Sequence, residues 1–264
     1  MTLCIAWKDQ KDQVHLASDS RVTAAKNSVE DVAVKVTRIP CEIFPPSSNI
    51  TANTGVIRLS LGMAFAGSHL GAYVIKESLV EVLSRLQFVP GTTEISMDKI
   101  VKIAFFAYEN LSKRLCSTSI GEKGICEIFL VGFCLKHNRV RAFKLSTDPN
   151  TNKHSCIEIL AQGTSKIELS GSGKNAPSLQ TKLNTDPLRA LKDVIDDPTR
   201  EDVGGPFQYG ICTTTDFKIF CEYLIDSAGQ PAYMRAGLNI NSLIGANDHN
   251  DLFIAPLMYD LNVH

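Results

Sequence analysis

The residue with the clearest chemical potential is Thr2, which removal of Met1 would place at the N-terminus. A threonine hydroxyl is a poor nucleophile until a base takes its proton, and a free α-amine has a pKa of about 7.7–8.0. An N-terminal threonine therefore carries a nucleophile and a base in one residue. The small side chain of residue 2 permits removal of an initiator methionine, although many proteins begin with Met-Thr by chance.

Two charged residues further along the chain, Asp19 and Lys35, could tune that hydroxyl. Taken alone, Asp19 can belong to an ordinary turn, and Lys35, which lies between two valines, can point to solvent from an alternating strand. If Lys35 is buried instead, it needs a carboxylate partner, because an unpaired buried charge is costly. Asp19 is the natural partner, and a buried lysine beside the N-terminus would lower the pKa of the amine and the hydroxyl there.

A third candidate segment is Ser170-Gly-Ser-Gly-Lys174, which resembles half of a phosphate-binding loop. That loop requires a glycine at position 168 and a serine or threonine at position 175, where this chain has Glu168 and Asn175. A Gly-Ser-Gly between a strand and a helix can also bring the backbone and the hydroxyl of Ser172 close to a reacting centre. The same residues occur in plain turns, so both interpretations stay open.

Composition restricts the classes of protein to which this chain can belong. It has 264 residues, of which 44% are hydrophobic and 21% charged, as in globular proteins with a buried core. The 27 basic and 28 acidic residues lack the basic surplus of a protein that binds nucleic acid by neutralising phosphates. No apolar run is long enough to span a bilayer, and the start does not resemble a signal peptide. We therefore expect a cytoplasmic protein with no nucleic-acid or membrane partner.

The eight cysteines and six histidines do not follow metal-site spacing. There is no Cys-x-x-Cys pair and no His-Glu-x-x-His motif. Most of the cysteines stand among apolar residues, which predicts reduced, buried side chains that act as small hydrophobes. We expect neither a metal nor an organic cofactor.

Hydrophobic periodicity predicts strands, two helices, strands, two helices and strands, in that order. A hairpin is expected over residues 3–7 and 14–17, because two short apolar runs flank a polar turn. The other predicted strands are 32–36, 57–66, 125–135, 139–145, 157–160, 207–212 and 217–224, and the helices are 68–86, 96–111, 175–183 and 188–195, with Ser68 as an N-cap. Residues 39–55 are predicted to form an extended loop.

This order lacks the strict β-α alternation of a parallel sheet and favours an α+β fold. The expected architecture is a four-layer α/β/β/α sandwich of two antiparallel sheets with helices outside. No repeat and no Pro-, Gly- or Ser-rich linker divides the chain. We predict a single domain over residues 1–225, with residues 226–264 as a C-terminal extension packed on the same domain.

The order and spacing of these motifs resemble the proteasome-type N-terminal nucleophile (Ntn) hydrolases. These include proteasome β-subunits and bacterial relatives of the heat-shock-locus V and Anbu branches. The similarity covers about residues 2–225 and is most specific in the first 70. It rests on Met-Thr-Leu-Cys-Ile-Ala at the start, Leu-Ala-Ser-Asp-Ser-Arg-Val-Thr after a hairpin, a strand with a lysine, Ala-Phe-Ala-Gly-Ser before one helix and Ser-Gly-Ser-Gly before another. The resemblance implies the Ntn hydrolase fold.

The resemblance also implies roles for five residues. Thr2 would be the nucleophile with its own amine as the base, and Asp19 and Lys35 would be the charge pair that tunes it. Gly67 matches the glycine whose backbone N–H forms the oxyanion hole. Ser172 matches the serine that hydrogen-bonds near the terminal amine.

The match is incomplete in the region that normally supplies a second aspartate and serine. Arg21 corresponds to a supporting basic residue of the family. The family usually has an aspartate three residues before Ser-Gly-Gly, whereas here the serine position is Val203 and Arg200 stands in place of the aspartate. Asp202 or Glu201 could substitute after a local shift.

The function implied by the resemblance is an N-terminal threonine peptidase that works through an acyl-enzyme ester after loss of Met1. Relatives assemble into rings or spirals that sequester the site, so the implied partners are further copies of this chain and peptides or unfolded proteins as substrates. No ATPase module lies in the chain, so any ATP-dependent unfoldase would be a separate protein. The departures around Arg200 leave open a catalytically silent structural subunit, and a small-molecule amidase of the same nucleophile class is a third reading.

Overall fold

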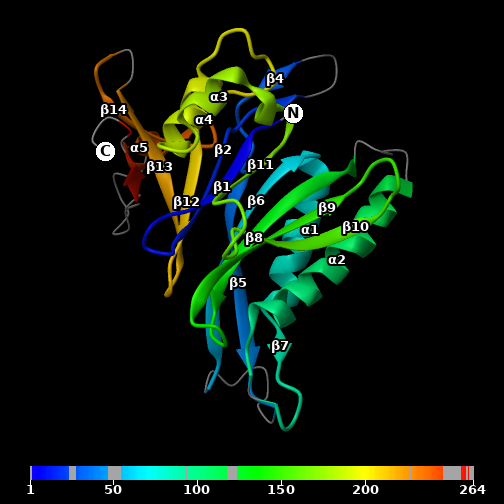
Figure 1. Cartoon of the computed structure of the whole chain (residues 1–264). Coiled ribbons are helices and arrows are strands. Elements are labelled where there is room, and N and C mark those ends of the chain that lie inside the picture. The colour runs from blue at the N-terminus through cyan, green and yellow to red at the C-terminus, as the bar shows by residue number, and fades with distance from the viewer. Residues whose placement is uncertain are drawn as a thin grey trace.

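The computed structural model describes residues 2–23, 28–46, 55–92, 94–117, 124–225, 228–245, 257–259 and 261. Met1, on which the prediction of N-terminal processing depends, lies outside these residues. Figure 1 shows two large sheets in the middle of the molecule with helices on their outer faces.

The first sheet carries the N-terminal hairpin toward one edge, next to the edge strand β11. Its strands lie in the order β11 (Ile167–Ser170), β1 (Cys4–Lys8), β2 (Val14–Ser18), β12 (Gln208–Cys212), β13 (Phe217–Ile225), β14 (Pro231–Arg235) and β15 (Leu238–Asn239), while β16 (Met258–Tyr259) pairs with β13. The pairings are antiparallel except for that of β16 with β13. The predicted hairpin is therefore confirmed, as β1 and β2.

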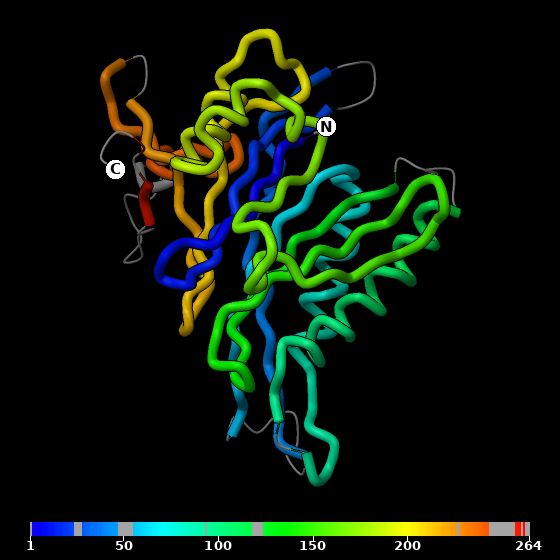
Figure 2. The backbone as a smooth tube through the Cα atoms, viewed as in Figure 1, coloured from blue at the N-terminus to red at the C-terminus, as the bar shows by residue number. Residues whose placement is uncertain are grey.

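The second sheet follows from the middle of the chain. Its strands lie in the order β10 (His154–Ile159), β9 (Arg139–Thr147), β8 (Cys126–Cys134), β6 (Ile57–Gly67), β5 (Val36–Phe44) and β7 (Leu86–Gln87). A short ribbon of β3 (Val22–Thr23) and β4 (Val29–Glu30) stands apart from both sheets. Figure 2 shows β5 and β6 as long neighbouring strands, which run antiparallel to each other.

Helices cover the outer face of each sheet. α1 (His69–Leu83) and α2 (Met97–Ser117) pack on the second sheet, and α3 (Pro177–Lys182) and α4 (Pro187–Ile195) pack on the first. The short 3-10 helix η3 (Ser172–Asn175) follows β11, and α5 (Ile240–Gly245) follows β15. The result is the predicted four-layer α/β/β/α sandwich (Figure 1).

Successive side chains along a strand point to opposite faces of the sheet, which explains how each sheet can bury both of its faces. On β6, Leu61, Met63 and Phe65 point into the cluster beneath α1 and α2, whereas Ala64 and Ala66 point into the cluster between the sheets. The small residues on the inner face let the two sheets approach closely. Six of the eight cysteines are buried, most of them in these clusters.

Two predicted segments were wrong in the region before β6. Residues 39–44 belong to β5 rather than to a loop, and residues 32–35 precede that strand rather than form one. The prolines at 40, 45 and 46 favoured the loop prediction. Pro40 fits in β5 because the strand pairs with β6 on one side along its length but with β7 only at Ile43 and Phe44, which leaves the other side open at Pro40.

The remaining chain is partly tied to the first sheet. β14 continues the sheet beyond β13, so part of the predicted C-terminal extension packs on the same layers. The division at residue 225 stays a prediction. Among the described residues, no helix combines the length and the apolar character that crossing a bilayer requires.

Candidate active site

Five strand ends meet at one edge of the sandwich and bring the predicted site residues together. Thr2 directly precedes β1, Asp19 directly follows β2, and Lys35 directly precedes β5. Gly67 is the last residue of β6, and Ser172 lies just after β11. Because β1 pairs antiparallel with both β2 and β11, the start of β1 is set beside the ends of its two neighbours.

The centre of the site is a buried lysine between a hydroxyl and a carboxylate. The Lys35 Nζ donates to Thr2 Oγ1 at 2.8 Å and to Asp19 Oδ1 at 2.9 Å. All three residues are almost fully buried, with 2% of Thr2, 0% of Asp19 and 1% of Lys35 exposed. The lysine therefore faces inward, which is the geometry that would couple it to residue 2.

Asp19 is held by hydrogen bonds to both carboxylate oxygens. Its Oδ1 accepts from the backbone N–H of Leu3 at 3.1 Å, and its Oδ2 accepts from the backbone N–H groups of Arg21 at 3.1 Å and Gly204 at 3.3 Å. These bonds and Lys35 satisfy a carboxylate that has no contact with solvent. Asp19 is thus fixed in one orientation toward the lysine.

Burial dominates the electrostatics of this pair. It lowers the pKa of Lys35 and raises the pKa of Asp19, while the attraction between the two groups opposes both changes. A lysine whose charged form is made less favourable by burial gains more from a nearby negative charge than an exposed one does. An alkoxide forming at Thr2 Oγ1 would supply such a charge.

A buried glutamine in the first sheet positions the segment that carries the lysine. Gln208 Oε1 accepts from the backbone N–H of Lys35 at 2.9 Å and of Val36 at 3.2 Å. The Gln208 Nε2 donates to the carbonyls of Ala33 and Asp19. Sequence reasoning missed Gln208, although a glutamine at the start of an otherwise apolar strand was a usable signal.

A residue from beyond position 225 also holds the segment that carries Lys35. The Arg235 guanidinium, on β14, donates to Gln208 Oε1 at 3.0 Å and to the carbonyl oxygen of Val36. Burial lowers the pKa of Arg235 to about 10. The C-terminal part of the chain therefore contacts the backbone beside Lys35, a contribution that no sequence motif indicated.

Gly67 borders the pocket beside Thr2 and adopts a positive φ of 100°. A Cβ added there would lie 2.8 Å from the carbonyl oxygen of Ile125, which already accepts the N–H of Ser68 at 2.8 Å. Ser68 caps α1, as predicted, by accepting from the N–H of Gly71. The Ser68 N–H is thus occupied by Ile125, and the role of Gly67 stays a prediction.

The turn that carries Ser172 is packed against the backbone of Thr2. The N–H of Gly173 donates to the Thr2 carbonyl oxygen at 3.3 Å. Gly171 has φ 93°, and a Cβ there would lie 2.0 Å from the same oxygen, so only glycine allows this approach. The glycines of this partial phosphate-loop motif have a packing role here, because Gly171 makes room for the backbone of Thr2 and Gly173 for the side chain of Leu3.

Changing Gly171 to alanine should therefore displace Thr2. We expect the strained φ to cost about 1–2 kcal/mol of unfolding free energy and the clash a further ~1–3 kcal/mol. Gly163 is a matched control, because it has φ 84° but nothing within 4 Å of an added Cβ. Chemical denaturation of Gly171→Ala and Gly163→Ala measures the difference, and equal losses would contradict the close contact.

Ser172 is hydrogen-bonded to Asp202. The family pattern places its aspartate two residues earlier, at position 200. The Ser172 Oγ donates to Asp202 Oδ2 at 2.6 Å, and Arg200 donates to both oxygens of Asp202. The structure thus brings Asp202, the supporting residue suggested above, to the serine. Arg21 instead forms a two-bond ion pair with Asp31 and reaches Asp19 only through its backbone N–H.

Two pockets border Gly67. A pocket of about 520 Å³ is lined by Thr2, Lys35, Gly67 and Ile125, among others. A second pocket of about 350 Å³ shares Gly67 and Ile125 with it and is lined by Ser172 but not by Thr2. Thr2 and Ser172 therefore line different pockets that share Gly67 and Ile125.

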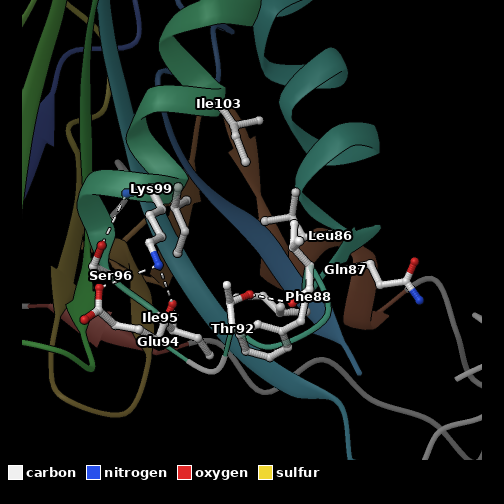
Figure 3. Close-up of a pocket in the computed structure, with 12 residues that line it drawn as sticks. Leu86, Gln87, Phe88, Thr92, Glu94, Ile95, Ser96, Lys99 and Ile103 are labelled. Atoms are coloured by element: carbon white, nitrogen blue, oxygen red, sulfur yellow. Dashed lines mark hydrogen bonds and ion pairs between the residues drawn. The ribbon is translucent and has the colours of Figure 1, made fainter. Parts of the chain in front are cut away.

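A third pocket, drawn in Figure 3, lies away from these residues at the start of α2. Apolar side chains such as Leu86, Phe88 and Ile95 surround its space of about 350 Å³, and Lys99 pairs with Glu94 at the edge. The described residues of its lining include no nucleophile paired with a base, in contrast to the group formed by Thr2, Lys35 and Asp19. In the described parts of the chain, no cluster of three or more potential metal ligands occurs.

Comparison with solved structures identifies the architecture. Anbu (ancestral beta-subunit) from Yersinia bercovieri is similar with a TM-score of 0.52 and 19% identity, over 79% of this chain and 81% of that chain. The structure of the helical assembly of the Anbu complex from Pseudomonas aeruginosa is similar with a TM-score of 0.56 and 16% identity, over 83% and 85%. This chain has the fold of the proteasome-type Ntn hydrolases.

Sequence comparison alone does not detect this Ntn hydrolase fold. No protein-family model matches the sequence, and no curated protein matches it either. The Ntn architecture is nevertheless the one predicted from the motifs, and the sequence positions assigned to Thr2, Asp19 and Lys35 meet at its edge. The catalytic roles of these residues stay proposals.

Proposed function

We propose that this protein is an N-terminal threonine peptidase that hydrolyses peptide bonds through an acyl-enzyme ester. The observation that carries the proposal is the buried contact of Lys35 Nζ with both Thr2 Oγ1 and Asp19 Oδ1. A lysine in that position has no solvent to satisfy it and is oriented toward the one hydroxyl that could become N-terminal.

The proposed reaction begins after removal of Met1. The free Thr2 amine accepts the hydroxyl proton, and Oγ1 attacks the carbonyl carbon of the substrate while Lys35 stabilises the oxygen as its negative charge forms. The backbone N–H of Gly67 would donate to the oxygen of the tetrahedral intermediate. The amine then gives its proton to the leaving nitrogen as the C–N bond breaks. Water attacks the resulting ester in the same way and releases Oγ1.

The shape of the site favours an extended substrate over a small amide. The two pockets that share Gly67 and Ile125 together offer space for more than one residue of a substrate. A small-molecule amidase would need only one enclosed pocket. This geometry supports a peptide or an unfolded protein as the substrate.

Assembly and location are further parts of the proposal. The Anbu structure from Pseudomonas aeruginosa is a helical assembly. We propose that this chain likewise forms a homo-oligomer, a ring or a spiral, that encloses the site in the cytoplasm. A separate ATP-dependent unfoldase would then supply substrates.

Intact-mass analysis and active-site labelling test this function directly. We expect the isolated protein to lack Met1 and to react with a β-lactone electrophile, with the adduct mapped by fragmentation to Thr2. Thr2→Ala is the matched control, because it also permits removal of Met1 but has no hydroxyl to acylate. A protein that retains Met1 and forms no adduct would instead be the catalytically silent subunit.

A further inference from the structure

Arg200 stands where the family pattern has an aspartate, and its contacts give it a different role. Its Nε donates to Asp202 Oδ1 at 2.9 Å and its terminal nitrogen to Oδ2 at 2.8 Å, which is a two-bond guanidinium–carboxylate pair. The Asp202 carboxylate also accepts the Ser172 hydroxyl at 2.6 Å. The side chains are mostly shielded, with 21% of Arg200 and 13% of Asp202 exposed.

This network reaches the N-terminal residue through the register of β1 and β11. Cys4 is paired with Ser170 in the antiparallel ladder. Beyond Ser170 the chain turns at Gly171, whose φ is 93°, into the short helix η3, which begins at Ser172. The hydrogen bond from Gly173 N–H to the Thr2 carbonyl holds this turn against residue 2. Because the Ser172 hydroxyl donates its proton to Asp202, its oxygen can act only as an acceptor toward other groups.

An ionised carboxylate near an amine stabilises the ammonium form, which raises the pKa of the amine and leaves less of it free to accept a proton at neutral pH. Three other carboxylates on the surrounding elements have cationic partners. These pairs are Asp19 with Lys35, Asp31 with Arg21, and Glu127 with Lys144, and the remaining charges on the adjoining turns are Glu201 and the exposed Lys174. Arg200 gives Asp202 a cationic partner of the kind that these carboxylates have.

We infer that Arg200 is a positioning residue that lets Asp202 hold the Ser172 hydroxyl without strengthening the proton affinity of the Thr2 amine. The importance of Arg200 for catalysis rests on the proposed function. The effect of Arg200 on the pKa of the Thr2 amine does not depend on it. Burial of Asp202 acts to raise its pKa, but the hydrogen bonds from Arg200 and Ser172 outweigh burial and lower it. Asp202 thus stays an ionised acceptor.

The test uses full-length chain released from an N-terminal fusion so that Thr2 is the first residue. The pKa of its α-amine is measured from the pH dependence of carbamylation by cyanate, quantified on the N-terminal peptide. Arg200→Gln removes the positive charge, and we expect it to raise the pKa of the amine by about 0.5 to 1. Arg200→Lys keeps the charge and should restore most of the original value.

The double variant Arg200→Gln with Asp202→Asn separates charge from local damage. It removes both charges, so the pKa of the amine should return close to that of the parent protein. An unchanged pKa in Arg200→Gln, or a raised one that persists in the double variant, would overturn the inference.

Peptide hydrolysis gives a second readout that keeps the two proposals distinct. If Thr2 is the nucleophile, the acidic limb of kcat/KM in Arg200→Gln should move to higher pH by the same amount as the pKa of the amine. A purely structural role would lower activity at every pH without moving the limb. A protein without any hydrolytic activity would defeat the proposed function, while the carbamylation result would still decide the role of Arg200.

Discussion

Thr2→Ala should reduce peptide hydrolysis by about 10⁴-fold or more, because no hydroxyl remains to form the acyl-enzyme ester. Alanine leaves the α-amine and the backbone contacts of residue 2 in place, including the hydrogen bond from Gly173. The Lys35 ammonium loses one acceptor but keeps Asp19, so we expect the free energy of unfolding to fall by only ~1 kcal/mol. The loss of activity would then come from chemistry and not from unfolding.

Thr2→Ser is the matched comparison, since serine is also small enough to allow removal of Met1 and retains the hydroxyl. It should keep measurable hydrolysis, whereas Thr2→Ala should not. The measurement is cleavage of a fluorogenic peptide and of a denatured protein, with unfolding followed in parallel. Activity of Thr2→Ala equal to that of the parent protein would rule out the nucleophile.

The central residues of the site could be found from sequence because they lie at strand ends close together in the chain. Asp19 ends a hairpin whose first strand starts beside Thr2, so the short β1–β2 connection alone brings them together. The orientation of Lys35 was harder to predict, because the inward direction of its side chain depends on how the second sheet packs. The position of Lys35 between two valines leaves both orientations open, and the hydrogen bonds of its Nζ to Thr2 and Asp19 show the inward one.

The parts that sequence did not reveal depend on contacts between distant segments. Arg235 reaches the Lys35 segment from β14, and Gln208 reaches it from β12. Asp202 could be named from the sequence as a possible substitute, but its hydrogen bond with Ser172 and its pair with Arg200 could not. Each contact depends on how two sheets or two loops pack, which no local pattern specifies. β5 was missed for another reason, because Pro40 argues against a strand unless one side of that strand is open.

Lys35→Met is expected to lower the free energy of unfolding by about 3–5 kcal/mol and to abolish hydrolysis. It leaves the Asp19 carboxylate fully buried without its counter-ion, and an uncompensated buried charge is strongly destabilising. The matched control is Lys113→Met, which breaks the exposed helical pair with Glu109 and should cost less than about 0.5 kcal/mol. Denaturation at neutral pH measures both losses.

The penalty in Lys35→Met should also depend on pH. Burial without the lysine raises the pKa of Asp19 above its value in the unfolded chain, so the folded state binds a proton more readily than the unfolded state. Stability of the variant relative to the parent protein should therefore recover as pH falls below that raised pKa and decline again as pH rises through it.

The double variant Lys35→Met with Asp19→Asn decides whether the pair acts in catalysis or only in folding. Removing both charges removes the uncompensated one, so much of the lost stability should return, although the polar asparagine keeps its hydrogen bonds to Leu3 and Gly204 only in part. Hydrolysis should not return, because nothing then stabilises the charge that forms on Thr2 Oγ1. A double variant that regains both stability and activity would show that the buried pair serves the fold alone.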